Sequence, residues 1–177
     1  SLLGYQRLVM GQQPSSAGAI LTVIEAESGI LRATNPGAGD FVGGIAFTTA
    51  VVSGGAVIER DFTTDRLSVI GRHRDLADPV ALEPGRRLDG RQGAMPDPCF
   101  AQRLMVSLEP GAMLVCDWLL GEAMSETELS DLQQRYADPA AIGAAFDEAV
   151  AFWEDLVSRV QVETPEPAID LMLNGWL

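Results

Sequence analysis

Arginine is the residue type whose distribution in this chain points most directly to chemistry. All twelve basic residues are arginine, and eight of them lie between Arg60 and Arg103. A planar guanidinium binds phosphate or carboxylate through paired hydrogen bonds, so this stretch could contact a phosphate, a sugar or the acidic surface of another domain. Ion pairing within the protein is nevertheless the favoured interpretation, because aspartates are interleaved with the arginines. These are Asp61, Asp65, Asp75, Asp78 and Asp89.

No set of residues predicts catalysis or metal binding. His73 is the only histidine and lies between two arginines, which is typical of a solvated or hydrogen-bonded loop residue. One histidine and two cysteines cannot supply the usual four ligands of a zinc site. Glu148 and Asp155 share a helix face, as acids on a water-facing helix commonly do. We therefore predict no catalytic residue and no metal site within these residues.

Charge and composition restrict the class of partner. Residues 1–108 hold ten arginines against eleven acids, whereas residues 109–177 hold two arginines against fourteen acids. The acidic second part would repel a phosphate backbone, so nucleic acid is not an expected partner. No apolar run of about 18 residues predicts a membrane span, and no signal peptide is visible. With only Cys99 and Cys116, a reduced, cytoplasmic protein is expected, although whether the two cysteines pair stays open.

The first two thirds of the chain have the pattern of an antiparallel sandwich. Runs of strand length are separated by short turns rich in Gly, Pro and Asn, which predicts roughly seven strands. Gly44–Val52 and Ala56–Phe62 are predicted to form a hairpin across Ser53-Gly54-Gly55, and Cys99–Leu108 and Ala112–Gly121 to pair across Glu109-Pro110-Gly111. The expected strands and loop are Tyr5–Met10, Ala19–Ala26, Ile30–Thr34, Gly44–Val52, Ala56–Phe62, Cys99–Leu108, Ala112–Gly121 and the long loop Glu83–Pro98.

The pattern then changes to the 3.6-residue period of helices. Ser125-x-x-Glu128 is a capping box, and Asp138-Pro139 begins a second helix as N-cap and first helical residue. Its apolar stripe includes Phe146 and Trp153, and a third helix is predicted from Ala168. We expect a mainly β fold with C-terminal helices: an antiparallel, supersandwich-like domain over 1–121, part of a larger sandwich, and a helical linker over 122–177. The apolar pattern continues to Leu177, so the chain is interpreted as a piece of a longer protein that lacks its next domain.

Several motifs resemble a known family in order and spacing. The main one runs through Asp65-Arg66, Val69-Ile70, Gly71-Arg72 and Asp78-Pro79-x-Ala81-Leu82, and Asp97-Pro98 and Tyr136-x-Asp138-Pro139 follow it. A final match, Thr164-Pro165 through Trp176-Leu177, is the most specific. Together they resemble glycoside hydrolase family 94, which contains cellobiose and chitobiose phosphorylases and the phosphorylase-like part of cyclic β-1,2-glucan synthases. Val69 departs from the pattern, because the family has an aromatic residue there.

The resemblance implies a function for the parent protein rather than for this chain alone. Members have an N-terminal β-sandwich, a helical linker and a helical barrel that cleaves β-glucosidic bonds with inorganic phosphate as co-substrate and an Asp as general acid. The segment here corresponds to the late sandwich, the linker and the first turns of the barrel. It implies a non-catalytic module that packs on the missing catalytic barrel and shapes its site for a β-linked glucose oligosaccharide. No cofactor is implied, and homodimer formation stays open.

Arg66 and Arg72 are the predicted substrate-binding residues, because they stand in the matching motif beside the long loop. They would contact sugar, phosphate or a neighbouring domain. Two alternatives remain: a stand-alone carbohydrate-binding sandwich and a purely structural interaction fragment. The first needs an exposed aromatic platform, whereas Trp118, Trp153 and Trp176 lie in apolar patterns for which core packing is expected.

Overall fold

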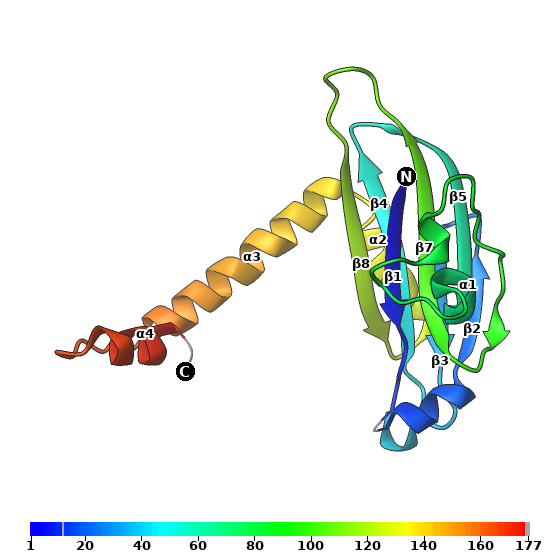
Figure 1. Cartoon of the computed structure of the whole chain (residues 1–177). Helices are drawn as coiled ribbons and strands as arrows, with labels where there is room; N and C mark the ends of the chain where they lie inside the picture. Colours follow the sequence, from blue (N-terminus) through cyan, green and yellow to red (C-terminus); the bar gives the residue numbers. More distant parts are fainter. Residues whose placement is uncertain (12, 176–177) are drawn as a thin grey trace. The chain divides into compact units, whose positions relative to one another are not determined.

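The computed structural model describes residues 1–11 and 13–175. Contacts divide the chain into two compact units, Ser1–Ala137 and Asp138–Leu177. The first unit contains two antiparallel sheets (Figure 1). The predicted fold class, a mainly β antiparallel sandwich followed by helices, is confirmed.

The two sheets are built from strands that are far apart in the sequence. The three-stranded sheet has the order β1-β7-β5, with β1 Leu2–Arg7, β7 Pro98–Ser107 and β5 Ala56–Asp65. The five-stranded sheet has the order β6-β2-β3-β4-β8. Its strands are β6 Gly93–Ala94, β2 Leu21–Glu25, β3 Ile30–Thr34, β4 Ile45–Ser53 and β8 Val115–Ala123. Short 3-10 turns lie at Pro14–Ala19, Gly39–Phe41 and Val80–Leu82.

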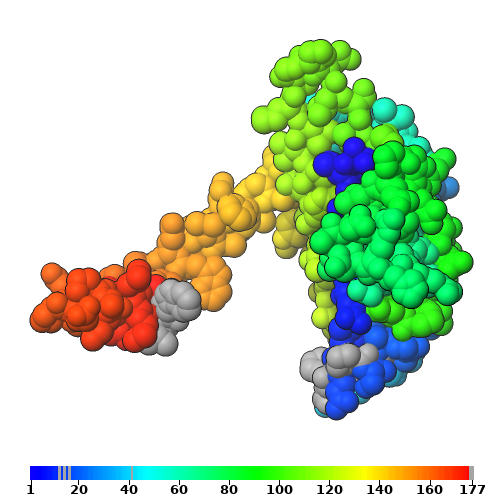
Figure 2. Space-filling view, viewed as in Figure 1, coloured from blue at the N-terminus to red at the C-terminus, as the bar shows by residue number. Residues whose placement is uncertain are grey.

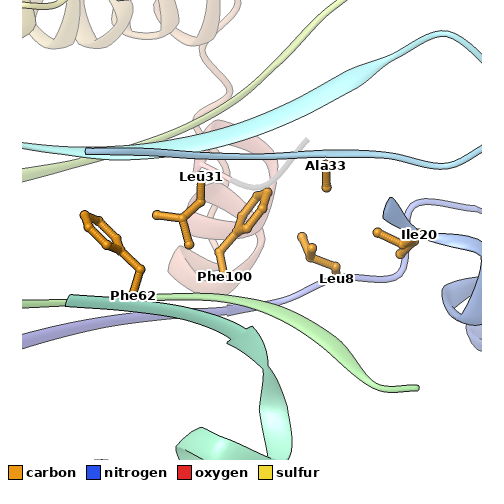
Figure 3. Close-up of a cluster of buried hydrophobic side chains, with 6 residues drawn as sticks. All are labelled: Leu8, Ile20, Leu31, Ala33, Phe62 and Phe100. Carbon is orange, nitrogen blue, oxygen red and sulfur yellow. The ribbon is translucent and has the colours of Figure 1, made fainter. Parts of the chain in front are cut away.

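The main core lies between the two sheets. Phe62 of β5 and Phe100 of β7 point toward Leu31 and Ala33 of β3 (Figure 3). Phe100 and Leu31 are completely buried. Strand alternation explains the arrangement, because every second residue of each strand faces the opposite sheet.

Strand β7 is buried on both faces from Pro98 to Leu104. Cys99 and Ala101 alternate with Phe100 and pack in a second cluster, against Val69 and Ile70 of helix α1, Arg66–Ile70. A third cluster covers the outer face of the five-stranded sheet, where Leu129 of helix α2, Glu126–Arg135, packs on Ile30, Ile45, Phe47 and Ala123. The sandwich unit therefore includes α2.

The two strand pairs predicted across glycine turns are wrong, although the strands themselves exist. β4 pairs with β3 and β8, while β5 pairs with β7, so the turn at Ser53–Gly55 crosses from one sheet to the other. The connection from β7 to β8 crosses in the same way. The two crossings lie side by side, because a Cβ on Gly54 would lie 2.4 Å from the Met113 carbonyl oxygen. β2 and β3, in contrast, do form a hairpin within the five-stranded sheet.

The predicted helix starts are confirmed. Ser125 Oγ accepts the Glu128 amide at 3.1 Å, and Glu128 Oε2 accepts the Met124 amide at 2.7 Å. Asp138 Oδ1 accepts the Ala140 amide at 2.9 Å and begins helix α3, Pro139–Ser158. Helix α4 follows at Pro167–Gly175. Asn174 ties α4 to the α3–α4 connection through both the amide and the carbonyl of Val162.

The expected core packing of tryptophan holds only in part for Trp118, which is half-buried, and is wrong for Trp153 within this chain. A Cβ on Gly4 of β1 would lie 2.4 Å from the Trp118 ring, so the ring packs closely on that strand. Trp153 remains 59% exposed, and Phe146 is 69% exposed. The reason is size, because two helices cannot surround an apolar stripe of this width. Trp176 lies outside the described residues.

Candidate functional site

The arginine-rich motif forms helix α1 and the loop that follows β5. Asp65, at the end of β5, is the N-cap of α1, and its Oδ1 accepts the Leu67 amide at 3.0 Å. The helix ends at Gly71, whose φ of 89° is a left-handed conformation that favours glycine. The loop returns over the three-stranded sheet and forms much of the green face of the sandwich unit in Figure 2. Buried Ala81 and Leu88 hold it there, since both pack with Cys99 and Ala101.

Asp65 and Asp89 share one polar network. Arg91 Nη1 lies 2.8 Å from Asp65 Oδ2, and Arg91 Nε lies 3.2 Å from Asp89 Oδ2. Thr63 and Ser68 donate hydroxyl hydrogen bonds to Asp89 at 2.7 and 2.6 Å. Burial raises the pKa of Asp89, but the bonds from Ser68 and Thr63 outweigh it and hold that pKa below its usual value. The network fixes the loop to β5 and α1.

Arg66 is held by Tyr5 of β1 and by Asp97, which directly precedes β7. Its Nε donates to the Tyr5 hydroxyl at 3.1 Å, and its Nη1 donates to Asp97 Oδ2 at 3.2 Å. Hydrogen bonding to Tyr5 raises the pKa of Arg66, and burial raises the pKa of Tyr5. The guanidinium therefore has a defined orientation and is always charged.

A pocket of about 610 Å³ lies beside this arginine. Its charged lining residues are Asp65, Arg66, Arg74, Arg91 and Asp97. Three cations against two anions suit a hydroxyl-rich or anionic group, or an acidic protein segment. Its lining, as far as the chain is described, contains no histidine, cysteine or serine that could act as a base or nucleophile.

The two predicted binding residues have different surroundings. Arg66 lines the pocket, whereas Arg72 does not and lies beyond the C-terminal end of α1. Arg72 is exposed and makes no ion pair or side-chain hydrogen bond with any described residue. The adjacent His73 is also exposed and has a φ of 62°. Arg72 is thus available to a partner, while Arg66 is already bound.

The preferred interpretation of the cluster, ion pairing within the protein, holds for five of its eight arginines. Those that pair with acids are Arg66, Arg74, Arg87, Arg91 and Arg103. Within the described residues, Arg60, Arg72 and Arg86 have no acidic partner. Asp75 pairs with no arginine there and instead accepts the amide of Ala77.

The sequence did not identify Tyr5 and Asp97 as members of the site, whereas Asp89 was among the acids expected to pair with the arginines. Tyr5 comes from β1, and Asp97 precedes β7, the strand next to β1 in the sheet. Asp97-Pro98 stood in a matching motif, which was the one available signal for Asp97. Nothing in the local sequence of Tyr5 indicates a hydroxyl aimed at Arg66, because the contact joins residues 61 positions apart.

Cys99 packs beneath helix α1, and its thiol is expected to be unreactive. It is completely buried, and burial raises the pKa of its thiol to about 12. Cys99 and Cys116 are free and stand on strands of different sheets. Neither is expected to act as a nucleophile at neutral pH.

The Cys99 thiol should make stability fall with pH in alkaline solution. The unfolded thiol ionises near its ordinary pKa of 9.0, whereas the folded thiol keeps its proton up to about 12. The unfolded state is therefore favoured as pH rises above 9, by about 1.4 kcal/mol per pH unit. Urea unfolding of the chain and of Cys99→Ala between pH 8 and 11 measures this. The variant should be less stable at pH 8 but show a shallower decline, and equal slopes would contradict the assignment.

The described residues show neither a metal-binding cluster nor a membrane-spanning helix. They contain no group of three or more His, Cys, Asp or Glu side chains placed to hold a metal ion. None of their helices has the length and apolar character needed to span a bilayer.

Comparison with known proteins places the chain in a family. Residues 1–139 match the family model described as glycosyl hydrolase 94, supersandwich domain. The chain is 32% identical over 176 residues to a cyclic β-(1,2)-glucan synthase of Rhizobium meliloti. This alignment covers 98% of the chain and 6% of the glucan synthase. The chain is 32% identical over 107 residues to an N,N'-diacetylchitobiose phosphorylase of Vibrio proteolyticus, covering 60% of the chain and 13% of the enzyme.

A third relative is covered to a similar extent as the chitobiose phosphorylase. A 3-O-β-D-glucopyranosyl-β-D-glucuronide phosphorylase of Paenibacillus borealis is 32% identical over 101 residues, which is 56% of the chain and 13% of that enzyme. The chain thus spans a small part of each of these relatives. Together with the two antiparallel sheets, the match over residues 1–139 shows that this chain belongs to glycosyl hydrolase family 94, as its supersandwich domain.

Proposed function

We propose that this chain is a non-catalytic module of a larger enzyme that acts on β-linked glucosides. The parent would be a glycoside phosphorylase or a glucan synthase. The family match carries this proposal, since the similar proteins are a glucan synthase and two kinds of phosphorylase. The module would pack on a helical catalytic barrel and shape the mouth of its sugar site.

The exposed apolar face of α3 supports the packing role. Phe146, Trp153 and Val157 are 69%, 59% and 43% exposed. Phe152 and Trp153 also stack edge to face, with ring centroids 5.4 Å apart. Exposed apolar groups of this kind mark an interaction surface. The proposed occupant is the catalytic barrel that the family resemblance implies.

Arg72 is proposed to contact the sugar, the phosphate or the neighbouring domain, and Arg66 to form the wall of the pocket beside it. The support for Arg72 is its exposure without an ion-pair partner in the described chain. The support for Arg66 is its position in the pocket lining. Both lie in the motif shared with the family.

Replacing Arg72 with alanine in the complete enzyme should lower kcat/KM for phosphorolysis of a β-glucoside by about ten- to a hundredfold. A hydrogen bond to a charged group contributes about 1.5–3 kcal/mol, which gives this range. Phosphate consumption measures the rate, and thermal melting checks folding. Because Arg72 makes no ion pair or side-chain hydrogen bond within the described chain, the melting temperature should not change.

Arg135→Ala is the matched control. Arg135 is also an exposed arginine of the sandwich unit without an ion pair among described residues, but it lies on α2. Its kcat/KM should stay at the wild-type value. Unchanged kinetics and unchanged assembly of Arg72→Ala would discard the proposed role.

Further parts of the proposal follow from the family rather than from the contacts described above. Inorganic phosphate would be the co-substrate of the parent enzyme, with no resident cofactor in this module. The parent would act in the cytoplasm on a β-linked glucose oligosaccharide. Sedimentation of the complete enzyme would establish whether it is a homodimer.

The alternative, a stand-alone carbohydrate-binding sandwich, lacks an aromatic platform in the described sandwich unit. Its one tryptophan, Trp118, packs against Gly4. Calorimetry of this chain with β-glucosides separates the two functions, because tight binding by the isolated chain would favour the alternative.

A further inference from the structure

Arg60 is half-buried and points toward the space between the two sheets. It stands opposite Leu104 in the β5–β7 register, and Leu104 is completely buried. Phe62, two residues further along β5, points into the core (Figure 3). Because side chains two apart on a strand share a face, Arg60 enters the space between the sheets from β5, an edge strand of its sheet.

This inward arginine has no carboxylate partner in the described chain. Its single hydrogen bond there runs from Nη1 to the Ala50 carbonyl oxygen, at 3.4 Å. A guanidinium carries five N–H donors, so most of its hydrogen-bonding capacity is unused. Charged groups withdrawn from water are normally paired, which makes an unpaired one informative.

The backbone is shaped to admit the guanidinium. Gly29, with a φ of 75°, lies in the turn between β2 and β3. A Cβ at this position would lie 2.5 Å from Arg60 Nη1. The left-handed conformation favours glycine, and the missing Cβ leaves room for the end of the Arg60 side chain beside this turn.

A pocket of about 280 Å³ opens at Arg60, between the five-stranded sheet and the end of α2. Tyr136 and Gln133 line it, and neither side chain has a hydrogen-bond partner among the described residues. Ser28 and Thr49 also line it, but their hydroxyls donate to Glu25 and to the Gly29 carbonyl. None of its described lining residues is acidic.

We propose that this pocket binds a small oxyanion, such as a phosphate group, with Arg60 as the charged ligand and Tyr136 and Gln133 as neutral donors. Only the guanidinium is charged, and the free side chains can all donate hydrogen bonds. A cation without a counter-charge, next to free hydroxyl and amide donors, fits a group that accepts several hydrogen bonds and carries negative charge. The proposal does not rest on the proposed function, because the pocket shares no residue with the one beside Arg66.

The experiment titrates the full 177-residue chain with sodium phosphate against sodium chloride at equal ionic strength. NMR follows the Arg60 Nε–H and the amides of residues 133–137, and calorimetry gives the dissociation constant. Saturable shifts confined to this pocket are expected. Glucose 1-phosphate and glucose are run in parallel. Tighter binding of glucose 1-phosphate than of phosphate would make a sugar phosphate the ligand, whereas equal binding would make it the free anion.

Variants test whether Arg60 is the ligand. Arg60→Gln should weaken phosphate binding at least about tenfold, since it removes a charged hydrogen bond, and Tyr136→Phe should weaken it a few-fold. Arg60→Lys, which keeps the charge, should bind with intermediate affinity and serves if Arg60→Gln does not fold. Arg86→Gln is the control, because Arg86 is exposed, unpaired in the described chain and outside the pocket.

Three results would overturn the proposal. The first is no saturable binding by the wild-type chain. The second is equal binding by wild type and by Arg60→Gln or Arg60→Lys, and the third is an equal loss in Arg86→Gln. The competing explanation is that Arg60 has a structural role and donates a hydrogen bond to Gln102 Oε1. This oxygen is buried without a hydrogen-bond partner among the described residues. In that case Arg60→Gln would lower the melting temperature and leave phosphate binding unchanged.

Discussion

Replacing Arg103 with alanine is expected to lower the free energy of unfolding by about 3–5 kcal/mol. Arg103 of β7 stands opposite Asp61 of β5, and their side chains are only 8% and 10% exposed. Arg103 Nε lies 3.1 Å from Asp61 Oδ1, and Nη2 also contacts Oδ2. Without Arg103, the buried Asp61 keeps only the mostly exposed Arg87, whose Nε is 3.8 Å away.

Urea unfolding of the full chain at neutral pH measures this loss. Amide hydrogen exchange of the β7 residues provides a second measurement. Arg7→Ala is the control, since Arg7 makes a comparable ion pair with Asp97 at 3.2 Å but is 58% exposed. That change should cost less than about 1 kcal/mol. Replacing both Arg103 and Asp61 with leucine should recover much of the loss, because no buried charge is left alone. Equal costs for Arg103→Ala and Arg7→Ala would refute the argument.

A loss of similar size, about 3–5 kcal/mol, is expected for Phe100→Ala. Phe100 is completely buried in the centre of the cluster between the sheets, where it packs with Leu31 and Phe62 (Figure 3). Its removal deletes contacts to both sheets and leaves a cavity that the paired strands cannot close by shifting. The same urea titration measures the effect.

Ile58→Ala is the comparison for Phe100→Ala. Ile58 lies on the same sheet, on β5, but is 67% exposed. Its replacement should change the free energy of unfolding by no more than about 0.5 kcal/mol. If the two substitutions cost the same, the inter-sheet cluster is not the core that holds the sandwich together.

The site could be predicted only in part. The motif around Arg66 and Arg72 was identified from the sequence, and ion pairing was the preferred interpretation of the cluster. The partners of Arg66 could not be identified, because Tyr5 and Asp97 approach it from other segments of the three-stranded sheet. In the sequence, Arg60 could not be distinguished from the other arginines of the cluster. Only the fold shows that its side chain points between the sheets, away from the neighbouring acids.

By itself, the sequence determined what depends on near neighbours. Strand alternation, the capping box at Ser125 and the Asp138-Pro139 helix start are local patterns, since each involves residues a few positions apart. The family resemblance likewise rests on short motifs in a fixed order.

Only the tertiary structure decided which strands pair. A glycine turn such as Ser53–Gly55 can connect neighbours in one sheet or cross to the opposite sheet. That choice depends on which distant strand takes the backbone hydrogen bonds. Here β7 takes those of β5 from more than thirty positions along the chain. The same long-range pairing aims Arg103 at Asp61 and leaves Arg60 without an acidic partner among the described residues.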